Sequence, residues 1–495
     1  MTAQLNVTGA SSAETTDWSA INWRTVYSSV RRIQVRIAKA TKEERWGKVK
    51  SLQRLLTHSY YGKLVAVQRV TSNKGKRTSG IDGKVWSTDR QKTLAITTLK
   101  RHGYKPSPLK RVYIPKKNNK TRPLSIPTIR DRAMQALYLL GLEPVAESVA
   151  DLNAYGFRQR RCCADAISQC FNALSNKNCA KFILEGDIKS CFDEINHDWL
   201  LQNIPMDKYI LAKWLKSGYI FKQRFYASNS GTPQGGIISP ALLTLTLSGM
   251  ETAIHSKCRK KKDKVNVIIY ADDFIVTADS EQLLEKTIKP CIEEFLKERG
   301  LVLSQEKTLI THINEGFNFL GHNIRKYGDK LLIKPSKENI KRVKAALRRR
   351  CLTASGHSSA TLLQMINPVI VGWSNYFSYV VSKEIFNKLD HYIFILVWKW
   401  ARKEHPNKSK KWIYSKYFQE DSKGRVRFGA KLPANKKIYL KYASDIPIVR
   451  HVKIRSEANP FLPEYNTYFN KRKRHMQAKR KANHTNHAQV AGDSA

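Results

Sequence analysis

Two adjacent aspartates, Asp272 and Asp273, are the residues of this sequence best suited to metal chemistry. An apolar, β-branched run over 265–270 leads into Ala271, and a second apolar run follows the doublet over 274–276. Runs of this kind separated by Asp predict a β-hairpin with two carboxylates at its tip. Because unpaired charge is costly beside apolar surface and Mg²⁺ prefers carboxylate oxygen, the pattern favours a divalent-metal site. The alternative is an ordinary hairpin with a solvated acidic turn.

A third carboxylate, Asp187, follows an apolar run at 182–184 that predicts a buried strand. Taken alone it is a weak signal, because Asp is common in the turns that end strands. Asp187 lies far from Asp272 in the sequence, so only the fold can bring the two together. If it does, the three carboxylates can hold two Mg²⁺ ions, one activating a primer 3′-hydroxyl and one clamping a triphosphate.

The chain is strongly basic, with 88 Lys and Arg against 40 Asp and Glu in 495 residues, a net charge of +48 and a pI near 10.0. Such a surplus indicates a polyanionic partner, and 10% aromatic residues supply stacking surfaces for unpaired bases. A ribosome-like or chromatin-like packaging protein is the alternative. The length predicts two to four domains or subdomains.

Cysteine and apolar segments indicate where the protein works. The eight cysteines include no CxxC pair, which suits a reducing compartment and disfavours a structural zinc site. The longest apolar runs are too short to span a bilayer, and residues 1–17 are polar with no secretion leader. We therefore expect a cytoplasmic protein of bacterial type without membrane contact, an organelle being the alternative, and a disordered lead over 1–17.

Cationic and glycine-rich stretches could bind phosphate. Residues 109–127 predict two strands joined by a turn at Asn118-Asn119, which is flanked by cations that include Lys116 and Arg122. Such a hairpin could grip a triphosphate or be only a solvated basic turn. Residues 231–250 begin as a Gly/Pro loop holding Gln234 and continue as an apolar helix.

Most of the remaining chain reads as helix. Apolar spacing predicts helices within 18–70, 131–149 and 281–300, and short strands over 301–324. After 336 the helices carry many basic and aromatic residues, a mixture typical of structured RNA recognition, although some aromatics must be helix core. The last segment, 436–495, has few apolar runs and predicts a loosely ordered basic tether.

These stretches together resemble a known family. The ordered set IPKKNNKTRPL, AYGFRQ, EGDIKSCFDEI, GTPQGGIISP, YADD, GLVLSQEKT and NFLGH resembles reverse transcriptases encoded by group II introns. The later VGWSNYF and KSKKWIYSKYF resemble the maturase region, domain X, of the same proteins. The resemblance runs from Trp18 to about Phe469, nearly the whole chain.

The resemblance implies an α+β right-hand polymerase fold. Its parts would be a helical N-terminal extension with a template-covering insertion (18–90), fingers and palm with antiparallel sheet (91–335), an α-helical thumb or maturase domain X (336–435), and a basic DNA-binding region and tail (436–495). Many members end in an H-N-H endonuclease with cysteine pairs. Here the last cysteine is Cys351, and nothing after Phe469 resembles that module, so second-strand cleavage is not expected.

The resemblance also implies site residues. It carries metal binding to Asp187, the Ile188 backbone and Asp272, with Asp273 as the third catalytic carboxylate. It implies triphosphate binding by Lys116 and Arg122, exclusion of a ribose 2′-hydroxyl by Phe192, and nucleotide contacts by Gln234 and Ala271. For RNA binding we predict Arg348, Arg349, Arg350, Trp373, Tyr376 and Lys411. For DNA binding we predict Lys471, Arg472, Lys473 and Arg474.

The function expected from this resemblance is an RNA-directed DNA polymerase that uses two Mg²⁺ ions, binds its own intron RNA to assist splicing, and copies the intron at DNA targets. The partners would be group II intron RNA, target DNA and deoxynucleoside triphosphates, with a homodimer as one expected assembly. Alternatives are a splicing-only maturase, a stand-alone host reverse transcriptase, and an RNA-directed RNA polymerase. Phe192 argues against the last, because its ring should clash with a 2′-hydroxyl.

Overall fold

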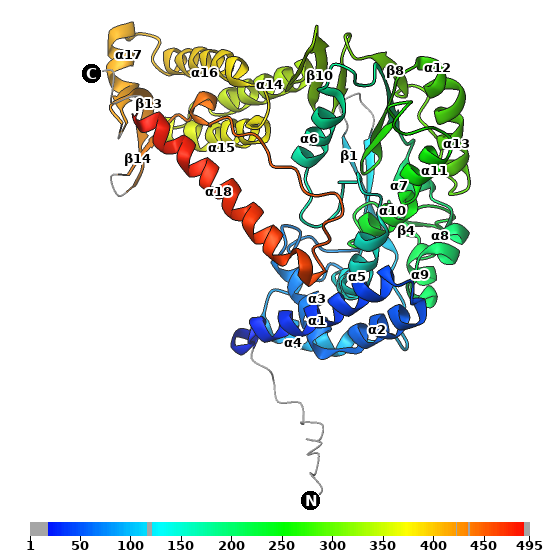
Figure 1. Ribbon diagram of the computed structural model, residues 1–495. Helices are drawn as coiled ribbons and strands as arrows, with labels where there is room; N and C mark the ends of the chain where they lie inside the picture. The colour runs from blue at the N-terminus through cyan, green and yellow to red at the C-terminus, as the bar shows by residue number, and fades with distance from the viewer. Residues whose placement is uncertain (1–17, 116–120, 422, 434–435, 490–495) are drawn as a thin grey trace, which may run out of the picture.

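The computed structural model describes residues 18–115, 121–421, 423–433 and 436–489, with side chains described as far as 478. Figure 1 shows helices α1–α5 at one end of the molecule, the sheets that contain β1, β4, β8 and β10 above them, and α14–α17 with β12–β14 at the other end. None of the helices in these ranges combines the length and the apolar character needed to cross a bilayer.

Helix α5 is the centre of the N-terminal end. It is apolar on almost all sides, so it is buried all round rather than along one stripe. Helices α1 to α3 pack around it, and the Gln34 side chain donates to the Leu140 carbonyl at 2.9 Å. The helices expected within 18–70 and near 131–149 are thus confirmed. The bounds are α1 (Trp23–Lys42), α2 (Trp46–His58), α3 (Tyr60–Ser72), α4 (Asp89–Thr98) and α5 (Ile129–Val149).

The basic hairpin expected at 109–127 is confirmed as two antiparallel strands, in which Ile114 lies opposite Arg122. Its turn, residues 116–120 with Lys116, lies outside the described residues. The hairpin belongs to a sheet of order β2-β1-β4-β5, in which β1 and β4 run parallel. The bounds are β1 (Leu109–Pro115), β2 (Thr121–Ile126), β4 (Tyr219–Phe221) and β5 (Arg224–Tyr226).

A second sheet, of order β6-β7-β3-β8 and antiparallel throughout, holds the three aspartates. Alternate residues of its strands enter two different cores: Leu184 packs with the N-terminal helices, whereas Ile183 packs toward the C-terminal helices. Burial on both faces explains why these strands are continuous apolar runs. The expected hairpin is confirmed. The bounds are β3 (Phe182–Asp187), β6 (Asn266–Tyr270), β7 (Asp273–Ala278) and β8 (Leu309–His312).

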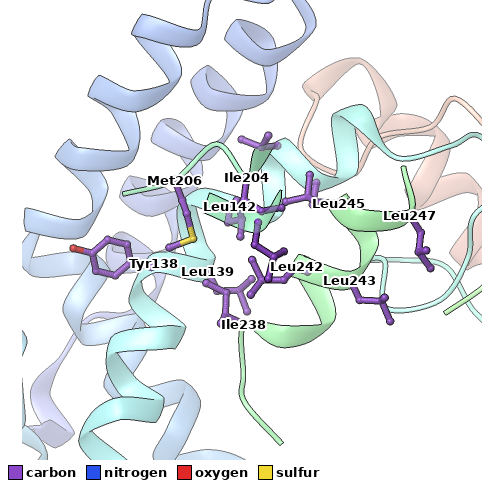
Figure 2. Close-up of a cluster of buried hydrophobic side chains, with 14 of the residues drawn as sticks. Tyr138, Leu139, Leu142, Ile204, Met206, Ile238, Leu242, Leu243, Leu245 and Leu247 are labelled. Carbon is purple, nitrogen blue, oxygen red and sulfur yellow. The ribbon is translucent and has the colours of Figure 1, made fainter. Parts of the chain in front are cut away.

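Short helices support this sheet on the side that faces α5. Figure 2 shows Leu242 of α10 packed near Leu139 and Leu142 of α5, with Met206 near Tyr138. The helix expected at 281–300 is present, with one wider π turn inside it. The bounds are α6 (Cys163–Leu174), α7 (Cys191–Glu194), α8 (His197–Asn203), α9 (Lys208–Leu215), α10 (Ser239–Leu247), α11 (Met250–Ser256), α12 (Glu281–Leu283), η2 (Leu284–Ile288) and α13 (Lys289–Lys297).

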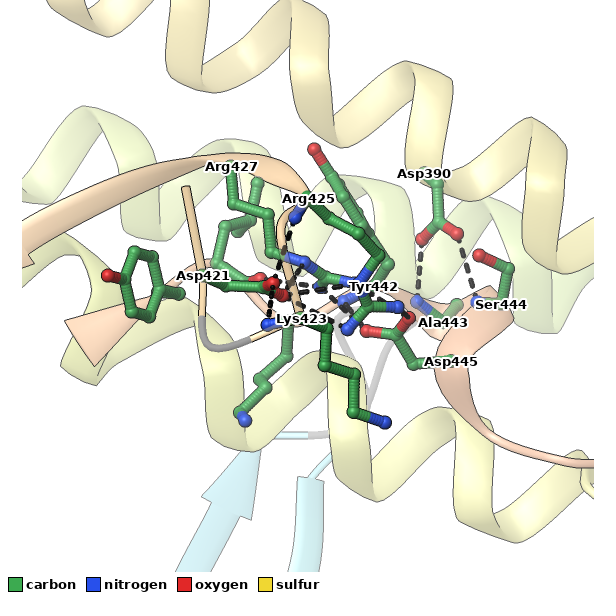
Figure 3. A network of polar contacts seen from close by, with 12 residues as sticks. Asp390, Asp421, Lys423, Arg425, Arg427, Tyr442, Ala443, Ser444 and Asp445 are labelled. Atoms are coloured by element: carbon green, nitrogen blue, oxygen red, sulfur yellow. Dashed lines mark hydrogen bonds and ion pairs between the residues drawn. The ribbon is translucent and has the colours of Figure 1, made fainter. Parts of the chain in front are cut away.

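The helical region expected after 336 is also confirmed. It follows a sheet of order β11-β10-β9 and carries a small sheet β12-β13-β14. Figure 3 shows how that small sheet is held, with Arg427 donating to both carboxylate oxygens of Asp445 at 2.6 and 2.8 Å. The bounds are β9 (Phe317–Phe319), β10 (His322–Tyr327), β11 (Lys330–Pro335), α14 (Lys337–Thr353), α15 (Ser359–Phe377), α16 (Lys383–Glu404), α17 (Lys410–Tyr417), β12 (Phe418–Glu420), β13 (Val426–Lys431) and β14 (Lys437–Tyr439).

The C-terminal segment differs from the loosely ordered tether that its composition predicted. After η4 (Ala443–Asp445) the chain returns to the N-terminal end, where Phe461 and Leu462 pack with Ala38. It then forms η5 (Pro463–Tyr465) and the long helix α18 (Asn466–Gln489), which runs in Figure 1 back toward β13. Phe461 and Leu462 are two neighbouring apolar residues that pack on a helix from another part of the chain, so the sequence of this segment has no hydrophobic periodicity from which its position could be predicted. The domain boundaries at 90, 335 and 435 stay predictions.

Candidate active site

The fold brings Asp187 and the acidic doublet together. Asp187 is the last residue of β3 and lies directly opposite Asp273, the first residue of β7. Ala271 and Asp272 form the tight turn between β6 and β7, and Ala271 adopts a left-handed backbone with φ of 59°. Three carboxylates predicted from two distant stretches of the sequence therefore lie at the same end of two neighbouring strands.

Their negative charge is only partly balanced. Loss of hydration, followed by repulsion from Asp272 and Asp187, raises the pKa of the Asp273 carboxyl to about 6, although the residue keeps an exposed surface. The Lys307 ammonium donates to Asp187 at 2.7 Å, and this hydrogen bond raises the pKa of Lys307. One lysine thus faces three carboxylates.

This donor set fits a hard divalent cation. Carboxylate oxygens are what Mg²⁺ prefers, and an added cation would relieve the repulsion that raises the pKa of Asp273. Ile188 pairs with Leu303 through bonds made by its neighbours, Asp187 and Lys189, so its own carbonyl is directed away from that partner. The three carboxylates do not all converge within 4.8 Å, a spacing reached among the described residues by Cys162, Asp165 and His451.

The residue predicted to exclude a 2′-hydroxyl, Phe192, lies on α7, directly after Cys191. Burial raises the pKa of the Cys191 thiol, and the carboxylates of Asp272 and Asp187 are close enough to raise it further. The amide of Thr232 donates to its carbonyl at 2.6 Å. Gly231 makes this approach possible, because a Cβ there would lie 2.5 Å from backbone atoms of Asp193. Gln234, from the same loop, donates to the Asp193 carboxylate at 3.3 Å. The Gly/Pro loop thus fixes the backbone of α7.

The predicted triphosphate contacts come from the neighbouring sheet. Arg122 is exposed on β2, whereas Lys116 lies outside the described residues. This sheet is connected to the Gly/Pro loop, because the Ser125 amide of β2 donates to the Gln234 carbonyl at 2.7 Å. Lys307 was not predicted as a site residue. The sequence feature that could have pointed to it is its place in the family-like stretch GLVLSQEKT.

The six predicted RNA-binding residues divide into two groups. Arg348, Arg349 and Lys411 are exposed, and Arg350 is partly exposed. The two aromatics make contacts within the protein, although Tyr376 is also 41% exposed. Trp373 packs on Phe377 and Phe386, and the Tyr376 hydroxyl donates to the Leu320 carbonyl at 3.0 Å.

Two aromatic residues that sequence reasoning missed are about as exposed as Tyr376. Trp412 and Tyr414 on α17 are 39% and 47% exposed, and Lys408 and Lys416 lie over the Trp412 ring. Their signal was the lysine-flanked KSKKWIYSKYF stretch, in which aromatic and basic residues alternate.

The four predicted DNA-binding residues lie on α18. Lys471, Lys473 and Arg474 are exposed. Arg472 turns inward and donates to the buried Asp165 at 2.7 Å and to the Val452 carbonyl at 2.8 Å. Its guanidinium lies 3.0 Å from His451, so the cluster of Cys162, Asp165 and His451 already contains a cation. Arg472 therefore anchors α18 to α6.

Comparisons with known proteins match three parts of the chain. Residues 18–99 match the N-terminal domain of reverse transcriptase, residues 114–324 match reverse transcriptase (RNA-dependent DNA polymerase), and residues 340–418 match the group II intron maturase-specific domain. Protein YkfC of Escherichia coli is 33% identical over 324 residues, which cover 56% of this chain and 83% of YkfC.

The group II intron-encoded protein LtrA of Lactococcus lactis is 31% identical over 334 residues, covering 53% of this chain and 54% of LtrA. The chain thus matches most of one relative and about half the length of the other. Among solved structures, telomerase from Candida albicans with an RNA fragment gives a TM-score of 0.37 at 12% identity, over 63% of this chain and 64% of the telomerase chain.

Proposed function

The chain belongs to the group II intron reverse transcriptase and maturase family, and on this premise we propose that it copies RNA into DNA and assists the splicing of its intron RNA. The resemblance and the α+β reverse transcriptase fold predicted from the sequence are confirmed by these matches. The substrates, the two-ion mechanism and the roles of single residues are the proposal developed below.

The observation that carries the polymerase proposal is the pairing of Asp187 with Asp273 across β3 and β7, beside Asp272. Asp187, Asp272 and the Ile188 carbonyl would hold Mg²⁺, with Asp273 as the third carboxylate. Two bound Mg²⁺ ions would supply activation of a primer 3′-hydroxyl and neutralise charge on the triphosphate and leaving pyrophosphate.

The chain's own residues would then orient the nucleotide. Lys116 and Arg122 bind the triphosphate, since cations on a hairpin can hold several phosphate oxygens. Gln234 and Ala271 line the incoming nucleotide. Phe192 would exclude a ribose 2′-hydroxyl, so deoxynucleotides would be the substrate.

The maturase role would use the helices that follow. Exposed cations of α14 and α17, Arg348, Arg349 and Lys411, would bind intron RNA through phosphate. Exposed cations of α18 would bind target DNA. A homodimer and a cytoplasmic location stay predictions made from the sequence.

Primer extension on an RNA template with Mg²⁺ tests the polymerase proposal. Asp272→Ala should abolish extension, whereas Asp198→Ala, an exposed carboxylate on α8, should leave it unchanged. Extension by Asp272→Ala at the wild-type rate would refute the assignment.

Splicing of the intron RNA by the same variants tests the maturase proposal. Asp272→Ala should retain splicing, because folding an RNA needs no polymerase metals. A splicing-only maturase predicts no extension by the wild-type protein, and a stand-alone host reverse transcriptase predicts extension without any effect on splicing.

A further inference from the structure

The segment 153–157 lies along the free edge of β6 and continues the active-site sheet. The Tyr155 amide donates to the Ile269 carbonyl at 2.9 Å, and the Ile269 amide donates to the Asn153 carbonyl at 3.0 Å. Ala154 and Ile269 form a parallel bridge. The segment therefore acts as a short added strand next to the hairpin that carries Asp272.

Two residues of this segment are constrained by the active-site turn. A Cβ at Gly156 would lie 2.2 Å from the Ala271 amide nitrogen, so only glycine allows the approach. The next residue, Phe157, has a left-handed backbone with φ of 59°. A bulky residue rarely adopts this conformation, and such strain persists at functional sites when the surroundings over-determine it.

A buried charged cluster holds the segment in place. The Arg158 guanidinium donates to the Glu147 carboxylate at 2.7 and 3.0 Å and to the carbonyls of Asp151 and Ala154 at 2.6 and 2.9 Å. Both side chains of this ion pair are less than 5% exposed. The backbone on the C-terminal side of Phe157 is thus anchored directly to α5.

The Phe157 side chain is directed at the proposed sugar-selecting residue. Its ring meets the Phe192 ring edge to face, with centroids 6.1 Å apart and planes at 71°. Phe157 is nevertheless 53% exposed, so it is not an ordinary core residue. The Gly/Pro loop fixes the backbone of Phe192, and Phe157 contacts its ring.

We propose that Phe157 is a positioning residue for sugar selection, which holds the Phe192 ring in the orientation that excludes a 2′-hydroxyl. This inference rests on the proposed role of Phe192. Because Phe157 is fixed through Gly156 to the Asp272 turn and through Arg158 to α5, it sets the ring of Phe192 relative to the carboxylates. The segment 153–157 would then position both the sugar-selecting ring and the turn that carries the metal-binding Asp272.

The test is the ratio of deoxyribonucleotide to ribonucleotide incorporation by the full-length protein, measured as kcat/KM for each. Phe157→Ala should lower the ratio about three- to tenfold, the amount that an edge-to-face ring contact can supply. Phe157→Tyr, which keeps the ring, should stay near wild type. Phe157→Gly relieves the left-handed strain yet removes the ring, so it should behave as Phe157→Ala does.

A double-variant cycle separates positioning from direct contact. If Phe157 acts through Phe192, the double variant should have the ratio of Phe192→Ala alone. Additive losses would mean that Phe157 meets the nucleotide itself and would overturn the proposal. Phe171→Ala, a similarly exposed phenylalanine on α6, serves as the control with an unchanged ratio.

The two assignments fail in distinguishable ways. If Phe192→Ala lowers the ratio and Phe157→Ala does not, the positioning role is wrong while the selecting role stands. If Phe192→Ala leaves the ratio unchanged, both are wrong. Phe157→Tyr and thermal unfolding of each variant show whether a loss reflects folding, since a folding defect lowers both rates and leaves their ratio unchanged.

Discussion

Replacing Asp273 with Asn should stabilise the metal-free protein at neutral pH and at the same time destroy polymerisation. Asp273 lies opposite Asp187 and next to Asp272, and loss of hydration together with repulsion from both raises its pKa to about 6. Asparagine has nearly the same shape and carries no charge, so it removes the repulsion. It also removes a carboxylate from the proposed magnesium site.

The size and sign of the change in unfolding free energy follow from the shift in the pKa of Asp273. The folded state binds the Asp273 proton more tightly than the unfolded state, whose pKa is 3.8, so the cost to folding is absent below about pH 4 and complete above about pH 6. For a fully buried carboxyl, two pKa units would be worth about 3 kcal/mol. Because Asp273 is exposed and solvent screens the repulsion, we expect about 1 kcal/mol.

Urea unfolding of wild type and Asp273→Asn, at pH 4.5 and 7.5 without divalent ions, measures this difference. The variant should be more stable by about 1 kcal/mol at pH 7.5 and nearly equal at pH 4.5, and its advantage should shrink when Mg²⁺ stabilises the wild type. Primer extension should fall about a hundredfold or more.

A matched control lies at the other end of β7. Asp279 forms an ion pair with Lys264 at 3.0 Å, so Asp279→Asn loses an attraction and should be slightly destabilising. A wild-type stability equal to or above that of Asp273→Asn at pH 7.5 would show that the carboxylates do not repel one another as argued.

Three further substitutions test other parts of the structure. Gly156→Ala places a methyl group against the Ala271 amide, so extension should fall about a hundredfold in primer-extension assays while splicing is retained; an active variant would show that this approach is not required. Burial lowers the pKa of His322 to about 4, so the unfolding free energy of the wild type should fall by about 3 kcal/mol between pH 6.5 and pH 4. His322→Gln should not show this loss in urea unfolding. The same pH dependence in both proteins would contradict the prediction. Arg427→Met leaves Asp445 without its buried partner and should cost about 3 kcal/mol in urea unfolding, with early proteolysis of β12–β14, whereas a cost below about 1 kcal/mol would mean that water replaces the guanidinium.

Local patterns predicted the secondary structure around the site well. Two apolar runs around Asp272 predicted the hairpin, and a third before Asp187 predicted its neighbour, because side-chain period and turn residues are encoded within a few positions. The helices after 336 were predicted for the same reason. The C-terminal return was missed, because Phe461 and Leu462 dock singly on cores built by other segments.

Side-chain direction could not be predicted in this way. Trp373 was predicted as a stacking surface for RNA, yet its ring packs on Phe377 and Phe386, whereas Tyr376 stays 41% exposed. Arg472 belongs to a run of four cations, but the structure turns it onto Asp165. Composition does not distinguish an aromatic or cation that faces solvent from one that faces a partner element, because only the packing of helices decides which face is covered.

The sequence by itself determined which residue types the chain offers and the order of its strands and helices, and with them the family and the identity of the three carboxylates. Only the tertiary structure decided that Asp187 lies opposite Asp273, that Lys307 reaches Asp187, and that Phe157 contacts Phe192. The physical reason is that hydrophobic periodicity is local. Which strand pairs with which, and which ring meets which, depends on burying apolar faces contributed by segments far apart in the chain.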